Sequence, residues 1–157
     1  MPITTLLLAG ALEALVSDLE SRSPTLAALA STARALPNAR LEYAMAPPRP
    51  GRRAHANLRI FRPAHPSRAF CDAALDARIV LPPARTADEQ AALLAHELSH
   101  LLDVYAGLPP DDGASEARAQ AVERRVRAEA RGARAAAPDE LTTRLARAGS
   151  CIPAPRR

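Results

Sequence analysis

The segment TADEQAALLAHELSHLLD, Thr86–Asp103, decides which fold this chain is expected to adopt. Thr86 is followed three residues later by Glu89, a capping box of the kind that begins a helix. No glycine or proline then occurs before Gly107. The segment therefore predicts an amphipathic helix with one side packed into a core. Its apolar residues recur at helical spacing, at Leu94, Leu98, Leu101 and Tyr105.

The opposite side of this helix carries an HExxH motif, His96-Glu97-Leu98-Ser99-His100. Residues four apart lie one turn above each other, so both imidazoles point the same way and can bind one metal ion. Glu97 lies about 100° around the helix from His96, beside the metal rather than on it. A carboxylate there can take a proton from a water molecule bound to the metal. The motif thus predicts a metal site with an adjacent base.

Two histidines do not complete a zinc site, because catalytic zinc usually has three protein ligands and one water. The other histidines of the chain, His55 and His65, both lie upstream in loop-like sequence. No histidine follows the motif, which excludes a downstream histidine ligand. We therefore expect an acidic third ligand.

Glu116 is the preferred third ligand. It lies in the first turn of the helix predicted after a break at 107–113, where an antiparallel return brings its carboxylate back towards the two imidazoles. Glu123, two turns further along the same face, is the second choice. Asp111, Asp112 and a site without a third protein ligand stay open.

Three further side chains near the motif each have two interpretations. Asp103 lies on the metal-facing side and could accept the second ring N–H of a ligating histidine, but a surface acid at the helix end is an equal alternative. Tyr105 fits the core better than an oxyanion-stabilising role. Arg118 could pair with a carboxylate near the site, although a solvated position is favoured on a helix so rich in arginine.

The rest of the chain divides into helical and extended segments. Strand 77–81 lies just before the motif helix, where a peptide substrate could pair with its main chain; an ordinary core or edge strand is an equal alternative. Residues 47–53 predict an exposed loop. We expect one domain over 1–150 and a loose tail over 151–157. The other expected helices are 3–21, 24–36, 114–134 and one from 138 onwards, and the other strands are 41–46 and 57–62.

Composition sets broad limits. Of the 157 residues, 48% are hydrophobic but 3% aromatic, so a single helix-rich domain with a thin core is expected. All 21 basic residues are arginine, a pattern typical of GC-rich bacterial coding. The formal charge of +4 permits acidic partners, but a solvated basic surface is favoured. Nucleic-acid binding lacks support, because no aromatic residues are interleaved with the arginines.

Cysteine usage and the N-terminal sequence bear on location. Cys71 and Cys151 lie far apart in no CxxC pattern, so neither a cysteine metal site nor a disulfide framework is expected. Residues 3–16 are apolar, but no positive charge precedes them and Glu13 interrupts them. This argues against a signal peptide and against a membrane-spanning helix. The chain is therefore expected in the reducing cytoplasm, with a signal-independent export route left open.

These motifs resemble those of the gluzincin zinc metallopeptidases, above all the compact minigluzincins. HELSHLLD at 96–103 followed by SEARA at 115–119 is similar to the pattern of the mitochondrial inner-membrane peptidases that assist ATP-synthase assembly. ImmA/IrrE-type peptidases are a looser match. The resemblance covers about residues 77–130. One departure is Gln120, which stands where related enzymes often have an acid.

The resemblance implies an α+β, zincin-like fold. A short twisted sheet of about three strands would pack on the HExxH helix and on a following glutamate helix, beside two N-terminal helices. It also implies a zinc-dependent endopeptidase in which His96, His100 and Glu116 bind Zn2+. Glu97 would act as general base and then as acid during hydrolysis of a peptide or protein substrate. The alternative is a catalytically inactive zincin-like module with a structural metal site, whose basic helix docks an acidic partner.

Overall fold

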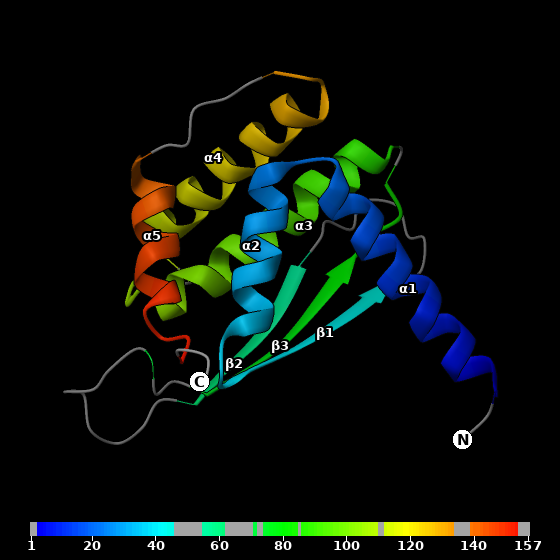
Figure 1. The fold of residues 1–157 in the computed structure, drawn as a ribbon, viewed down its shortest axis with the longest axis horizontal. Helices are drawn as coiled ribbons and strands as arrows, with labels where there is room; N and C mark the ends of the chain where they lie inside the picture. The colour runs from blue at the N-terminus through cyan, green and yellow to red at the C-terminus, as the bar shows by residue number, and fades with distance from the viewer. Residues whose placement is uncertain are drawn as a thin grey trace.

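The computed structural model describes residues 3–45, 55–61, 71, 74–84, 86–109, 112–133 and 139–153. Within them the fold is α+β, which confirms the expected class (Figure 1). The helices are α1 (Ile3–Ser21), α2 (Pro24–Ala35), α3 (Ala87–Tyr105), α4 (Gly113–Ala130) and α5 (Asp139–Gly149). The strands are β1 (Ala39–Met45), β2 (His55–Phe61) and β3 (Ala74–Leu81).

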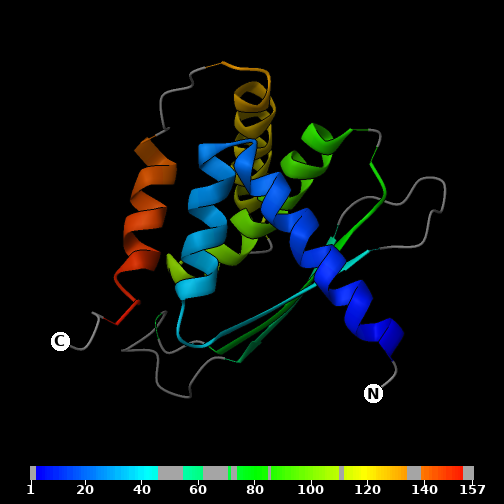
Figure 2. The same ribbon diagram turned by 45° about the vertical axis from the view of Figure 1, so that its right-hand side comes forward.

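β3 is the central strand of the sheet, whose order is β1-β3-β2. β1 runs parallel to β3, with Tyr43 opposite Ile79, and β2 runs antiparallel, with Ala56 opposite the same residue. Figure 2 shows α2, α3, α4 and α5 on one side of this sheet. Side chains alternate along β3 between the helices and solvent, and those in the core are Leu75, Ala77, Ile79 and Leu81.

Of the two equal interpretations of strand 77–81, the one in which a peptide substrate pairs with its main chain is wrong. β1 and β2 occupy both edges of β3, so its main-chain N–H and C=O groups already take part in the sheet. The order of strands depends on contacts between distant segments. It is therefore not visible in the sequence of any one strand.

α3 is the helix predicted from the HExxH segment, and it contacts β2, β3, α2, α4 and α5. Its first turn begins at the predicted cap, because Thr86 Oγ1 accepts a hydrogen bond from the N–H of Glu89 at 3.1 Å. The predicted apolar stripe is buried, which fixes how α3 is turned about its axis. Its members are Leu94, Leu98, Leu101 and Tyr105.

α1 and α2 cover the same side of the sheet as α3, and both begin and end close to the predicted bounds. Ser23 caps α2 by accepting the N–H of Leu26 at 3.1 Å, and Pro24 occupies the first turn. Glu129, near the end of α4, also accepts the N–H of Thr25 at 3.1 Å.

None of the described helices is long and apolar enough to cross a bilayer.

α4 ends at Ala130 and not at the expected residue 134. Gly132 has a φ of +83°, a left-handed conformation that glycine adopts without the strain of a Cβ. Its N–H donates to the carbonyl of Glu129 and the N–H of Ala133 donates to that of Ala128, the two bonds of a Schellman motif. The sequence did not indicate that α4 ends here, because the arginines and alanines on both sides of Gly132 favour a helix.

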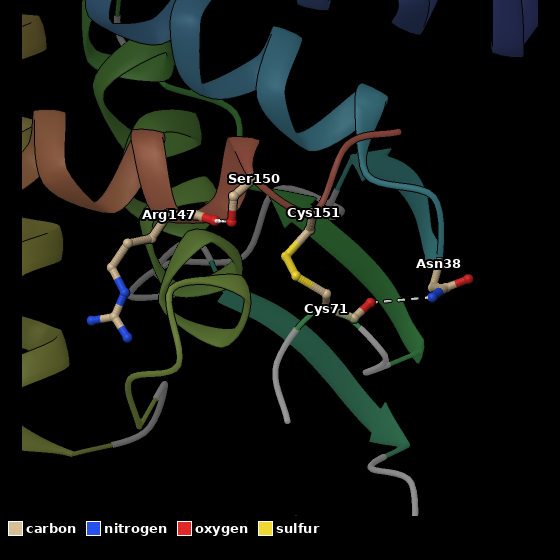
Figure 3. Close-up of a disulfide and its surroundings, with 5 residues drawn as sticks. All are labelled: Asn38, Cys71, Arg147, Ser150 and Cys151. Carbon is tan, nitrogen blue, oxygen red and sulfur yellow. Dashed lines mark hydrogen bonds between the residues drawn. A yellow bond between two sulfur atoms is a disulfide. The ribbon is translucent and has the colours of Figure 1, made fainter. Parts of the chain in front are cut away.

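The expectation that the two cysteines are unpaired is also wrong, because Cys71 and Cys151 form a disulfide (Figure 3). Cys151 comes directly after α5 in the sequence, and α5 packs beside α2 and α3 with Leu141 and Ala148 in the core. Cys71 lies in the segment of sequence that connects β2 to β3, and its carbonyl accepts a hydrogen bond from Asn38 at 3.3 Å. The cysteines are 80 residues apart, so no local spacing reveals the pair.

This bridge changes two other expectations. Cys151 is buried rather than part of a loose tail, while residues 154–157 of that tail lie outside the described residues. One argument for a reducing compartment, the lack of a disulfide, no longer applies. The loop expected at 47–53 lies outside the described residues.

Candidate metal centre

The structure brings His96, His100 and Glu116 together at one point between α3 and α4. The Nε2 atoms of the two histidines are 3.3 Å apart. Glu116 Oε2 lies 3.5 Å from Nε2 of His96 and 3.6 Å from Nε2 of His100. The three atoms therefore form a nearly regular triangle.

The turn between α3 and α4 creates this juxtaposition. Gly107 has a φ of +71°, and its N–H donates to the carbonyl of Val104 while that of Leu108 donates to Asp103. These bonds end α3. Asp112 then begins α4 by accepting the N–H of Ser115 at 2.6 Å. The first turn of α4 consequently lies against the last two turns of α3.

The triangle has the dimensions of a zinc site. Two ligands about 2.0 to 2.1 Å from zinc, separated by the tetrahedral angle, lie about 3.3 Å apart. The three observed separations, 3.3, 3.5 and 3.6 Å, are close to this value. Two imidazole nitrogens and one carboxylate oxygen also form a donor set found in catalytic zinc sites. The residues present therefore fit zinc in both spacing and chemistry.

One side of the triangle is accessible to solvent. The side chains of His96 and His100 are 15% exposed, whereas that of Glu116 is 52% exposed. Three protein ligands would leave one position of a tetrahedral zinc ion for water or substrate, as in catalytic zinc sites.

Glu116 is oriented by the residue that departs from the gluzincin pattern. Gln120 Nε2 donates to Glu116 Oε1 at 2.9 Å, so the carboxylate turns Oε2 towards the imidazoles. The pKa of Glu116 is lowered, chiefly by this hydrogen bond; partial burial opposes the shift, and His96 and His100 add to it. Gln120 therefore orients the carboxylate of Glu116 through its side-chain amide.

His96 is oriented by Glu123, the second choice for the third ligand. Glu123 Oε2 lies 3.1 Å from Nδ1 of His96, on the far side of the ring from Glu116, and Arg127 donates to Glu123 Oε1 at 2.6 Å. A carboxylate at Nδ1 favours a proton there and a lone pair on Nε2. This placement puts Glu123 behind the imidazole and outside the triangle.

His100 is oriented through Ser115. Nδ1 of His100 lies 2.8 Å from Ser115 Oγ, and that hydroxyl donates to Asp103 Oδ2 at 2.8 Å. Asp103 is fully buried, so the interpretation as a surface acid is wrong. It is linked to a candidate ligand, as the other interpretation held, but through a hydroxyl. Ser115 was missed because its only sequence signal was its position next to Glu116.

Two arginines surround the buried carboxylate of Asp103. Arg118 Nη2 donates to it at 2.8 Å and Arg144 Nη1 at 2.5 Å. Arg118 is 12% exposed, so the favoured solvated position is wrong. Arg144 is buried on α5, 41 residues from Asp103, and no sequence signal pointed to it. This pairing connects α3, α4 and α5 directly behind the candidate site.

The remaining candidates have other positions. Glu97 is buried beside His96 on α3. Tyr105 lies in the core, as favoured, and burial raises its pKa to about 12. Asp112 caps α4 and is not part of the triangle. Asp111, His65 and the side chain of His55 lie outside the described residues.

Comparisons with protein families, with curated proteins and with solved structures found no match. The functional argument therefore depends on the site itself.

Proposed function

We propose that this chain is a zinc-dependent peptidase of the gluzincin type. The observation that carries the proposal is the triangle of His96, His100 and Glu116, whose three atom pairs are 3.3 to 3.6 Å apart. Support comes from the partners behind it, because each ring has a hydrogen-bonding group at Nδ1 and Glu116 has one at Oε1. Oriented ligands of this kind are typical of a metal site.

The proposal includes a zincin-like packing of the elements. A sheet with an antiparallel edge strand lies beside the HExxH helix, and the helix carrying the third ligand packs against that helix on its other side. α1 and α2 also pack against α3. In this arrangement the candidate site lies between α3 and the beginning of α4.

Peptide hydrolysis follows from the residues around the site. Zinc, when bound, would acidify a water molecule and polarise the scissile carbonyl. Glu97 would accept the proton of the attacking water and then pass it to the leaving nitrogen. Glu97 suits this role by its position, because it is buried and lies next to His96 on α3.

The inactive binding module is less well supported. It requires several arginines of α4 to be available to an acidic partner. Arg124 is exposed, but three others pair within the chain, namely Arg118 with Asp103, Arg125 with Glu129 and Arg127 with Glu123. Bound zinc without cleavage of any peptide in a mixed library would nevertheless favour the module over the peptidase.

The experiment that tests the peptidase combines metal analysis with a peptide-library digest. Purified wild type is expected to contain about one zinc per chain and to cleave peptides. Glu97→Gln is expected to keep the zinc and to lose about 100-fold or more of the cleavage rate, because general base catalysis contributes at least that factor. Glu89→Gln, an acid in the first turn of the same helix, serves as the matched control and should cleave like wild type. Undiminished cleavage by Glu97→Gln would remove Glu97 from the mechanism.

A further inference from the structure

A chain of hydrogen bonds leads from His100 into the core of the protein. Nδ1 of His100 lies 2.8 Å from Ser115 Oγ, which in turn donates to Asp103 Oδ2 at 2.8 Å. We propose that Ser115 is a positioning residue that fixes His100 in the tautomer with its proton on Nδ1. The lone pair of Nε2 then points towards His96 and Glu116. This inference deepens the proposed function and rests on it.

The direction of the chain follows from the donors that are present. A carboxylate that faces two guanidinium groups only accepts, so the single hydroxyl hydrogen of Ser115 is directed to Asp103. The oxygen of Ser115 must therefore accept a hydrogen bond from the Nδ1–H of His100. The reverse direction would leave two oxygen atoms 2.8 Å apart without a proton between them.

Asp103 gives the chain a rigid end. It is fully buried and accepts bonds from Arg118 at 2.8 Å and from Arg144 at 2.5 Å. Turning the carboxylate would separate it from the two guanidinium groups and leave a buried charge without its partners, which is strongly unfavourable. Arg144 also donates to the backbone carbonyl of Ser99 at 3.4 Å, a contact that does not depend on the side chain of Ser99. Ser115 accordingly has one orientation, and so has the ring that donates to it.

The two histidines are therefore positioned by different means. His96 contacts the carboxylate of Glu123 directly, and the side chain of Glu123 is 21% exposed. His100 instead contacts the hydroxyl of Ser115, which is hydrogen-bonded to the fully buried carboxylate of Asp103. Ser115 is neutral, and the charged group nearest to Nε2 of His100 is Glu116, at 3.6 Å. The preference for a proton on Nδ1 therefore arises from the direction of the hydrogen bonds through Ser115. This property exists before any metal binds.

The first test measures the tautomer directly in metal-free protein. Long-range proton–nitrogen correlation spectra are recorded at about pH 8.5, well above the ordinary histidine pKa of about 6.5. His100 is expected to show a protonated Nδ1 and an unprotonated Nε2. A proton on Nε2 of His100 in the wild-type protein would overturn the proposal, and this test requires no variant to fold.

The second test uses a matched pair of serine variants. Ser115→Ala removes the hydroxyl but keeps the backbone N–H that donates to Asp112 at 2.6 Å. Ser99→Ala removes a hydroxyl that is equally buried and contacts the same arginine network through Arg144. Zinc affinity is measured by competition with a chromophoric chelator. We expect a loss of about 10- to 100-fold for Ser115→Ala and no change for Ser99→Ala.

The outcomes separate this inference from the proposed function. A mixture of tautomers at His100 in Ser115→Ala, together with weaker zinc binding, supports the positioning role. Wild-type tautomer and wild-type affinity in Ser115→Ala would overturn it. Equal losses in Ser115→Ala and Ser99→Ala would also overturn it, because general damage to the buried network would then be the cause. A wild-type protein that binds no zinc but keeps the Nδ1 proton would end the proposed function and leave the positioning role intact.

Discussion

At Glu116, the two oxygens of one carboxylate have different partners, and this allows a test of the third ligand. Oε1 accepts from Gln120, while Oε2 faces the two histidines. Glu116→Ala should weaken zinc binding by more than the about 10- to 100-fold expected when only a partner of a ligand is removed. Glu123→Gln provides that comparison, because Glu123 contacts Nδ1 of His96.

The measurement is zinc affinity by chelator competition on the two variants side by side. Wild-type affinity in Glu116→Ala with a severe loss in Glu123→Gln would exchange their roles. Equal, small losses in both would mean that no acid of α4 binds the metal directly.

The convergence of the motif residues could be predicted from the sequence, whereas contacts between side chains of different helices could not. His96 and His100 lie one turn apart on a single helix, so their convergence follows from helix geometry alone. Glu116 required only that the next helix return antiparallel. Ser115 and Arg144 meet Asp103 through tertiary packing, and no pattern in one segment encodes such a meeting.

At the scale of elements, Glu129 joins the end of α4 to the beginning of α2. Its carboxylate accepts bonds from Ser23, Thr25 and Arg125. Burial alone would raise the pKa of Glu129, but these hydrogen bonds outweigh it and the pKa is lowered below 4.5. The ionised form is therefore the one that stabilises the contact between the two helices.

The pH dependence follows from that direction. Because the folded pKa is lowered, the contribution of Glu129 is complete above the unfolded value and is lost as the pH falls through the folded pKa. Glu129→Gln should lower the free energy of unfolding by about 1 to 3 kcal/mol at neutral pH, and by less in acid. Urea unfolding at neutral pH and near pH 3 measures this difference. Glu140→Gln, an exposed acid on α5, is the control, and an equal loss at both pH values would contradict the prediction.

A second prediction at this scale concerns the end of α4. Gly132 has a φ of +83° and nothing lies within 4 Å of a Cβ built there, so alanine would be strained by its backbone alone. Gly132→Ala should cost about 1 to 2 kcal/mol. At Gly113 an added Cβ also meets nothing within 4 Å, and no left-handed φ opposes it. In thermal unfolding, Gly113→Ala should therefore be as stable as wild type or more stable, whereas Gly132→Ala should melt at a lower temperature. Equal melting temperatures for the two variants would contradict the predicted backbone strain at position 132.

The beginnings of α2 and α3 were predictable from their caps, whereas the end of α4 was not. Ser23 and Thr86 were recognised as caps because a cap acts on residues within one turn. The end at Gly132 lies among good helix formers, and only the backbone conformation shows that it terminates α4. The position of β3 between β1 and β2 depends on pairing across the chain.

At the scale of the whole molecule, the disulfide between Cys71 and Cys151 closes a loop with a sequence separation of 80 residues. By the chain-entropy estimate, a bridge across such a loop stabilises the folded state by about 4 kcal/mol. Reduction should therefore lower the midpoint of guanidinium unfolding substantially. A phosphine reductant is suitable for this measurement, because a dithiol would also compete for zinc.

The double variant Cys71→Ser with Cys151→Ser supplies the control. It should unfold at the lower midpoint whether or not reductant is present. A wild-type midpoint that does not change once mass spectrometry shows complete reduction would contradict the prediction.

Hydrophobic spacing predicted the individual helices and strands, whereas it did not predict the disulfide between Cys71 and Cys151. Spacing within a segment reports which face of that segment is buried. It does not report which distant segments become neighbours, and both the bridge and the order of the sheet depend on that.

The place of Cys151 after α5 also bears on biosynthesis. On a ribosome the chain emerges from its N-terminus, so the thiol of Cys71 waits for a partner that is made 80 residues later. The helices and strands described above have all been synthesised by then. The bridge therefore cannot form until all of these helices and strands have been synthesised.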